Sequence, residues 1–291
     1  MPPPRPRPPA ERYHDRVAGL YDSVYGDDPY WRLLRGLAWR RLRRWLPGLP
    51  GTRCLDAGCG TGFWGLRLIR SGLDADFLDL SRAMLDQAAL KIARLGRPLA
   101  AHGAWARGGP EPVPALEAGA SALWHASLDG LGHLPAGAYA LVVGQGDPLG
   151  CAENPGRALD GLARLLAPGG VMALSVDGRW PGAEPLLAAG DVEGLEDFLE
   201  EGRTRWRTDR PGERYPLATF TPGGLRALCR ARGLEILSLV GVTVLPLRRH
   251  RALLADRGRR LALARLEERL NAEESLLGGA AHLEITVRKP A

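Results

Sequence analysis

The chain alternates short apolar runs with segments whose apolar residues recur at helical spacing. The apolar runs predict buried strands at 52–57, 76–80, 122–126, 139–144, 170–176, 234–245 and 283–287. The periodic segments predict helices at 11–46, 63–71, 81–95, 154–166, 190–201, 221–233 and 248–271. This alternation predicts an α/β fold with a doubly wound parallel sheet, whose ligands bind beyond the carboxyl ends of the strands.

The regions between these elements suggest how the chain is divided. Residues 1–10 are rich in proline and arginine and lack an apolar core, so they predict a disordered tail rather than a signal peptide. A Gly/Pro/Ala-rich stretch at 97–120 predicts an irregular insertion. Residues 179–215 interrupt the alternation with an acidic and then a basic run, which predicts a cap. The expected divisions are an N-terminal helical lid segment at 11–50, a core at 51–178, the cap, and a C-terminal part of the sheet at 216–291.

Composition indicates a globular protein and excludes few functions. The 291 residues are 45% hydrophobic and 25% charged, and no apolar run approaches the roughly 20 residues of a membrane-spanning helix. The net charge of +6 is small, and Lys91 and Lys289 are the only lysines among 39 basic residues, as in proteins of GC-rich genomes. The four cysteines show no zinc spacing, so we expect reduced thiols in the cytoplasm and no metal site.

The most informative stretch follows the first predicted strand. Asp56, Gly58, Gly60 and Gly62 form a D-x-G-x-G-x-G pattern at a strand-to-helix turn, where glycines allow the backbone to approach a ligand closely. Gly60 also begins a G-x-G-x-x-G pattern that NAD sites use. Asp79 ends the second strand, where a carboxylate can accept hydrogen bonds from both hydroxyls of a ribose.

This combination resembles the first motifs of class I S-adenosylmethionine-dependent methyltransferases. The resemblance extends over roughly residues 53–176. It implies a Rossmann-like seven-stranded sheet whose last strand, at 283–287, is antiparallel. It also implies S-adenosylmethionine as cofactor, bound by residues that follow the first four strands: Asp56, Gly58, Cys59, Gly60, Gly62, Asp79, Leu80, Met84, Ser127, Leu128 and Gln145.

The same resemblance suggests what several of these residues do. Asp56 suits the ammonium of the methionine moiety, and Asp79 suits the ribose. The side chain of Met84 is expected near the adenine. Either Ser127 or Asp129 is expected at the adenine amine.

The segment after the fourth strand, residues 144–149, is expected to face the methyl group and the acceptor. It lacks the Asn/Asp-Pro-Pro-aromatic sequence of many methylases that act on base amines or glutamine amides, so those acceptors are disfavoured. Asp147 is our candidate catalytic residue, as a proton acceptor. His14, His125 and His133 are alternatives, although a lone histidine is more often structural.

Aromatic residues gather ahead of the sheet. They are Tyr13, Tyr21, Tyr25, Tyr30 and Trp31. In the small-molecule methyltransferases that this segment resembles, an N-terminal helical segment folds over the cofactor, and aromatic faces near a sulfonium would stabilise it. Packing of helices against the core is the alternative.

The favoured interpretation is methyl transfer from S-adenosylmethionine to a small-molecule acceptor by in-line displacement, with no membrane partner. Arginine pairs at 40–41 and 43–44 and the run at 248–251 leave an RNA methyltransferase open. A non-catalytic protein that binds S-adenosylmethionine and an NAD oxidoreductase are further alternatives. The acceptor, the methylated atom and the oligomeric state are left open by the sequence.

Overall fold

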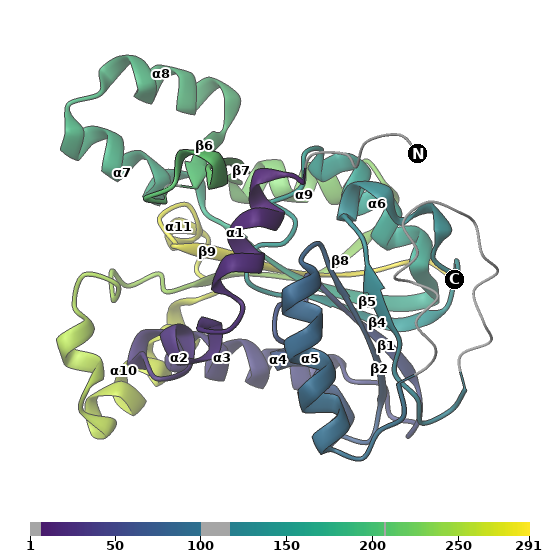
Figure 1. Ribbon diagram of the computed structural model, residues 1–291. Coiled ribbons are helices and arrows are strands. Elements are labelled where there is room, and N and C mark those ends of the chain that lie inside the picture. The colour runs from purple at the N-terminus through teal and green to yellow at the C-terminus, as the bar shows by residue number, and fades with distance from the viewer. Residues whose placement is uncertain (1–6, 100–116, 207) are drawn as a thin grey trace.

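The computed structural model describes residues 7–99, 117–206 and 208–291, and its centre is a seven-stranded sheet (Figure 1). The strand order is β3-β2-β1-β4-β5-β9-β8, and β9 alone runs antiparallel to its neighbours. The strands are β1 (Arg53–Ala57), β2 (Asp74–Asp79), β3 (Leu123–His125), β4 (Tyr139–Gly144), β5 (Leu166–Asp177), β8 (Glu235–Val242) and β9 (His282–Arg288). The predicted Rossmann-like sheet with an antiparallel last strand is confirmed.

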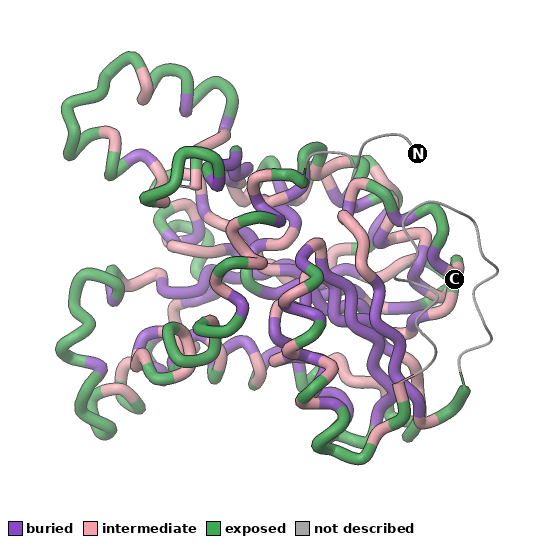
Figure 2. Tube along the Cα trace, in the orientation of Figure 1, coloured by how far each residue is buried: buried purple, intermediate pink, exposed green. Residues whose placement is uncertain are grey.

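Helices cover both faces of this sheet. They are α3 (Pro29–Leu42), α4 (Phe63–Arg70) and α5 (Arg82–Arg94) on one face, and α6 (Pro155–Leu165) and α9 (Pro222–Arg230) on the other. Because successive strand residues point to opposite faces, Leu141 packs with the first group and Val142 with the second. The strands are therefore buried from both sides, as Figure 2 shows.

Local capping explains where the helices begin. Ser81 accepts a hydrogen bond from the Met84 N–H at the start of α5, the N-cap role that the sequence predicts for it. Asn154 caps α6 and Thr221 caps α9 in the same way. The turn from β2 into α5 is thus fixed by hydrogen bonds next to the carboxyl end of the sheet.

The N-terminal region differs from the single helical stretch that was expected. It contains three helices, α1 (Pro9–Val17), α2 (Tyr21–Gly26) and α3, followed by a short 3₁₀ turn η1 (Arg43–Trp45). The boundary predicted for the tail is wrong by two residues, since proline is compatible with the first helical position and α1 begins at Pro9. Residues 1–6 of the expected tail, and 100–116 of the expected insertion, lie outside the described residues.

Residues 179–218 form an additional segment, of which the two helices at 179–201 project from the body of the molecule (Figure 1). They contain α7 (Arg179–Ala189), α8 (Val192–Glu201) and a small antiparallel pair, β6 (Arg203–Trp206) and β7 (Tyr215–Ala218), with the 3₁₀ turn η4 (Pro211–Glu213) between them. The boundary predicted at 215 falls inside β7 and is corrected to 218, because β7 pairs with β6. The 3₁₀ turn η3 (Leu128–His133) lies between β3 and β4. The 3₁₀ turn η5 (Arg251–Leu254), α10 (Arg257–Leu270) and α11 (Glu274–Leu277) follow β8. Among the described helices, none has the length and apolar character needed to span a membrane.

Candidate functional site

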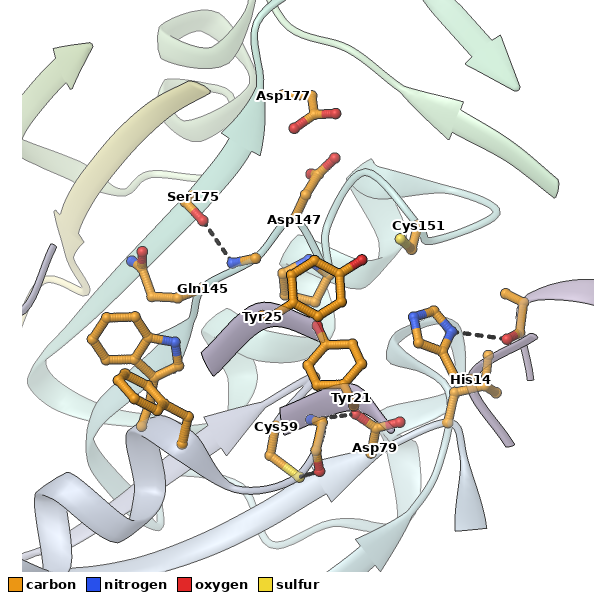
Figure 3. A pocket seen from close by; sticks show the side chains of 18 of the residues that line it. His14, Tyr21, Tyr25, Cys59, Asp79, Gln145, Asp147, Cys151, Ser175 and Asp177 are labelled. Atoms are coloured by element: carbon orange, nitrogen blue, oxygen red, sulfur yellow. Dashed lines mark hydrogen bonds between the residues drawn. The ribbon is translucent and has the colours of Figure 1, made fainter. Parts of the chain in front are cut away.

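A cavity of about 330 Å³ lies at the carboxyl ends of β1, β2, β4 and β5, and Figure 3 shows it from close by. A volume of this size is typical of small-molecule sites. Nine of the twelve residues predicted for the site line it: Gly58, Cys59, Gly60, Asp79, Leu80, Ser127, Leu128, Gln145 and Asp147. Asp56, Gly62 and Met84 are not among the lining residues.

The loop after β1 forms one wall of the cavity. Gly58 and Gly60 have φ angles of 71° and 51°, which favour glycine. The backbone N–H groups of Gly58 and Cys59 donate to the carbonyl oxygen of Leu78, at 2.7 and 2.9 Å, and this fixes the loop to β2. A Cβ atom on Gly60 would find only Tyr21 within 4 Å, so the loop leaves open space on the cavity side, where a ligand can approach the backbone.

Asp56 has a different place from the one expected. It is fully buried, and its Oδ2 accepts a hydrogen bond of 2.7 Å from the Gly65 N–H in the first turn of α4. Burial raises the pKa of this carboxyl to about 7. The carboxylate thus lies beneath the loop at the start of α4, and its expected role toward the ammonium of methionine stays a prediction.

Gly62 and Met84 are also buried and do not line the cavity. Gly62 precedes α4 with a φ of 88°, and a Cβ there would lie 3.1 Å from the Cβ of Ala88, so this glycine allows α4 and α5 to approach. The side chain of Met84 is fully buried in the first turn of α5. The expected place of Met84 near the adenine stays a prediction.

Asp79 ends β2 and faces the cavity. Its two carboxylate oxygens accept hydrogen bonds from the Gly60 N–H (2.7 Å) and the Ser81 N–H (2.8 Å). Burial raises the pKa of Asp79, and nearby His14 opposes the rise. A carboxylate has about four acceptor positions, so Asp79 keeps capacity for hydroxyl donors. This donor and acceptor pattern fits an adenosine ribose.

Ser127 and Asp129, the two candidates for the adenine amine, differ in position. Ser127 lines the cavity beside Leu128. Asp129 does not line it, because its carboxylate accepts hydrogen bonds of 2.9 Å from the N–H groups of Glu153 and Asn154. Gln145 follows β4, and its side-chain amide nitrogen lies 3.5 Å from the carbonyl oxygen of Ala173 in β5.

Asp147 lies at the opposite end of the cavity from Asp79 (Figure 3). It has a φ of 64°, unusual for a residue with a side chain, and it is 7% exposed. Burial raises its pKa well above the usual range, and the neighbouring carboxylate of Asp177 adds to the rise.

The three candidate histidines are separated by the fold. His14 lines the cavity and bonds the carbonyl oxygen of Ala10 at 2.8 Å. His125 lies behind the wall, 2.8 Å from the carbonyl oxygen of Leu80, and His133 is exposed on η3. The sequence analysis missed His282, whose Nδ1 lies 2.8 Å from Asp177 Oδ1 in the cavity wall. The antiparallel register that pairs Asp177 with His282 brings them together, and a prediction of that register would have found them.

The N-terminal helices cover the cavity. Four of the five aromatic residues singled out from the sequence line it, namely Tyr13, Tyr21, Tyr25 and Trp31. Tyr30 packs in the interior, with its hydroxyl 3.2 Å from that of Thr243. Burial raises the pKa of Tyr25 to about 12, as expected for a hydroxyl removed from water.

Polar contacts attach these helices to their surroundings. Asp15 on α1 accepts a hydrogen bond of 2.6 Å from the Ser81 hydroxyl, beside Asp79. Arg16 forms a two-pronged ion pair with Glu213, between β6 and β7. α1 therefore contacts both the turn after β2 and the additional segment at 179–218.

The chain is similar in sequence to proteins that are already known. Residues 30–239 match the family described as a methyltransferase domain. A stretch of 164 residues is 32% identical to the biotin biosynthesis bifunctional protein BioHC of Cellvibrio japonicus, but it covers 56% of this chain and only 26% of that protein.

Solved structures share the fold. The cyclase SpnF has a TM-score of 0.56 at 19% identity, over 98% of each chain. A SAM-dependent methyltransferase from Methanosarcina mazei has a TM-score of 0.54 at 17% identity, over 86% of this chain and 97% of that one. At such identities, the likeness shows the fold alone.

Proposed function

Because the chain belongs to the methyltransferase domain family and is a class I S-adenosylmethionine-dependent enzyme, as its motifs predict, we propose that it methylates a small-molecule acceptor. One observation carries this proposal. The cavity that begins at the glycine loop also includes Asp147 and Asp177, and helices of the same chain cover it. A partly covered cavity of this kind suits a cofactor and a small acceptor side by side better than a polymer.

The cofactor end is assigned to the residues that line it. We propose that Gly58, Cys59 and Gly60 lie along the methionine moiety and that Asp79 accepts the ribose hydroxyls. Leu80 and Leu128 offer apolar walls for the adenine, with Ser127 at its edge. Gln145 is placed between this end and the acceptor. When bound, S-adenosylmethionine supplies a methyl group on a positively charged sulfur.

The protein's own contribution is then alignment, exclusion of water and proton transfer. We propose that the aromatic side chains of α1–α3 exclude water above the cofactor, so that residues 11–50 act as a lid. The segment at 179–215, extended to 218, is proposed as a cap over the acceptor. Asp147 is the proposed proton acceptor, since it is buried and faces the cavity.

Several arginines of the runs that left an RNA substrate open form ion pairs within the chain. Arg40 pairs with Glu268 at 2.8 Å, and Arg41 pairs with Glu284. In the second run, Arg251 pairs with Asp28 at 2.6 Å. These pairs support a small acceptor over a phosphate backbone.

Two measurements test the proposal in order. Calorimetric titration with S-adenosylmethionine, S-adenosylhomocysteine and NAD should show binding of the first two and none of NAD. Transfer of an isotopically labelled methyl group is then followed in a small-metabolite extract and in total RNA. Label in the RNA alone would contradict the small-molecule acceptor, and binding of NAD alone would contradict the cofactor site.

A further inference from the structure

The acceptor end of the cavity contains a buried carboxylate, Asp147, with one oxygen that accepts no hydrogen bond from the described residues. Asp147 Oδ1 accepts a hydrogen bond of 3.0 Å from the Gly150 N–H. Oδ2 is buried, and no described group meets hydrogen-bond geometry with it. A buried acceptor that is left unsatisfied is costly, so a ligand with a donor at this point is favoured.

The position of this carboxylate is fixed by its surroundings. A Cβ on Gly150 would lie 2.4 Å from Asp147 Oδ1, so glycine is needed for the carboxylate to lie where it does. The left-handed backbone of Asp147 is a strained conformation of the kind found at binding and catalytic sites. Both features hold Asp147 with its side chain in the cavity wall.

A second carboxylate lies close by. Asp177 ends β5 and points toward Asp147 in Figure 3, and its charge acts on that residue. His282 binds the other side of Asp177. Two neighbouring carboxylates repel when both are ionised, and a cation between them removes that repulsion.

Aromatic rings line the cavity between its two ends: in Figure 3 Tyr25 lies between Asp147 and Asp79, and Tyr21 lies beside Asp79. The rings of Tyr25 and Trp31 have centroids 5.3 Å apart, and those of Tyr21 and Tyr25 are 4.6 Å apart. All three residues line the cavity. Aromatic faces attract ammonium groups, so these rings and the two carboxylates favour the same kind of ligand.

We propose that the acceptor is an amine, that its ammonium form binds between Asp147 and Asp177, and that Asp147 takes the proton that must leave before methylation. This assignment rests on the proposed function and adds the class of substrate to it. The lining also includes the aromatic residues above, which would contact the hydrocarbon part of the amine.

The proposed step is balanced. One proton moves from the ammonium nitrogen to Asp147 Oδ2, which leaves a neutral amine with a free electron pair. The nitrogen forms a bond to the methyl carbon as the carbon–sulfur bond breaks, and that bonding pair stays on sulfur. The positive charge passes from sulfur to the methylated nitrogen, so no oxidant, reductant or further reactant is needed.

Several other titratable groups border this point. They are Asp177 and His282 on β5 and β9, Tyr25 on α2, Cys151 between β4 and α6, Tyr215 on β7, and Arg248 after β8. Burial raises the pKa of Cys151 well above its usual value, so that thiol stays protonated. An amine that binds should then displace a proton from Asp147, because its positive charge favours the ionised carboxylate.

The test is calorimetry on the full chain saturated with S-adenosylhomocysteine. The probes are matched pairs that differ in one group: ethylamine and ethanol, ethanolamine and ethylene glycol, and phenethylamine and 2-phenylethanol. We expect at least one amine to bind about tenfold more tightly than its alcohol, and to release a proton when the titration is repeated in buffers of different ionisation enthalpy.

Asp147→Asn is the decisive variant, because asparagine also tolerates a positive φ and keeps the shape of the side chain. It should lose the preference for amines and the proton release. Asp86→Asn makes the same charge change on the exposed face of α5, outside the cavity lining, and should keep both. Binding of S-adenosylhomocysteine to each variant reports whether the site is still folded.

Three outcomes would overturn the amine assignment: alcohols that bind as tightly as amines, no binding of any amine in the set, or an unchanged preference in Asp147→Asn. The first two are measured on the wild-type protein and do not depend on how a variant folds. Failure of S-adenosylhomocysteine to bind would instead refute the proposed function, so the two failures are distinguishable.

Discussion

The two glycines of the cofactor loop allow one substitution to be tested in two environments. Gly58 and Gly60 both have positive φ angles, 71° and 51°. Alanine at either position meets a backbone penalty of about 1–2 kcal/mol. Their surroundings differ, because a Cβ on Gly58 would lie 2.3 Å from the Cβ of Pro148, whereas a Cβ on Gly60 would lie 3.8 Å from Tyr21.

The magnitudes follow from this difference. Overpacking a buried site costs about 1–3 kcal/mol, so Gly58→Ala should lower the free energy of unfolding by about 2–5 kcal/mol in total. Gly60→Ala should lower it by about 1–2 kcal/mol, since only the backbone penalty of a positive φ applies. Its added methyl group enters the cavity, so Gly60→Ala should weaken cofactor binding more than it weakens the fold.

Urea unfolding measures the loss of stability, and titration with S-adenosylhomocysteine measures the loss of cofactor binding. The midpoints of the variants can be compared when the slope of the free energy of unfolding against urea concentration is the same for each. Gly72→Ala is the control, because Gly72 has a φ of 85° and no atom within 4 Å of an added Cβ. Equal stability of the Gly58→Ala and Gly60→Ala proteins would refute the reasoning.

Three further predictions concern buried polar groups. Burial raises the pKa of Asp56 to about 7, so the folded protein keeps this proton where the unfolded chain loses it, and stability should fall by up to about 4 kcal/mol between about pH 4 and 7. Asp56→Asn should remove that part of the pH dependence in urea unfolding at each pH. Asp79→Ala should weaken cofactor binding at least about tenfold by calorimetry, because hydrogen bonds to charged groups contribute about 1.5–3 kcal/mol. Tyr30→Phe leaves the buried Thr243 hydroxyl without its partner and should cost about 1 kcal/mol of stability, with cofactor binding unchanged.

Much of the sheet could be predicted because its strands are short apolar runs between turns. The strand at 139–144 has the predicted bounds, and Ser81 caps the helix after the second strand as expected. α7 was missed, because Pro181 and Pro185 within Arg179–Ala189 are unfavourable for a helix by local propensity. The strands β6 and β7 were missed because each has only four residues.

The glycine loop and Asp79 could be placed from spacing alone, since both follow strands whose carboxyl ends meet at one edge of the sheet. The role of Asp56 could not, because a carboxylate two residues before a glycine turn can point into the site or beneath it. Only the packing of α4 decides this, through the Gly65 N–H. The pair of Asp177 and His282 depends on strand register across 105 residues, which no local pattern records.

The lid segment offers a last prediction, about rates rather than stability. Asp22 on α2 accepts a hydrogen bond of 2.6 Å from the Thr61 hydroxyl of the loop and pairs with Lys91 at 2.5 Å. Its side chain is 59% exposed, and exposed ion pairs contribute about 1 kcal/mol or less. Asp22→Asn should therefore leave global unfolding nearly unchanged and make opening of α2 easier by a few fold.

Because Tyr21 and Tyr25 on α2 line the cofactor cavity, easier opening of this helix should speed release of the cofactor. Stopped-flow measurement should show S-adenosylhomocysteine leaving Asp22→Asn about two- to fivefold faster, as expected for a contact of under about 1 kcal/mol. Asp27→Asn removes a more exposed ion pair at the end of the same helix, with Arg32, that does not reach the loop, and its release rate should match the wild type. An unchanged rate in Asp22→Asn would mean that the cofactor leaves by a route that does not require α2 to move.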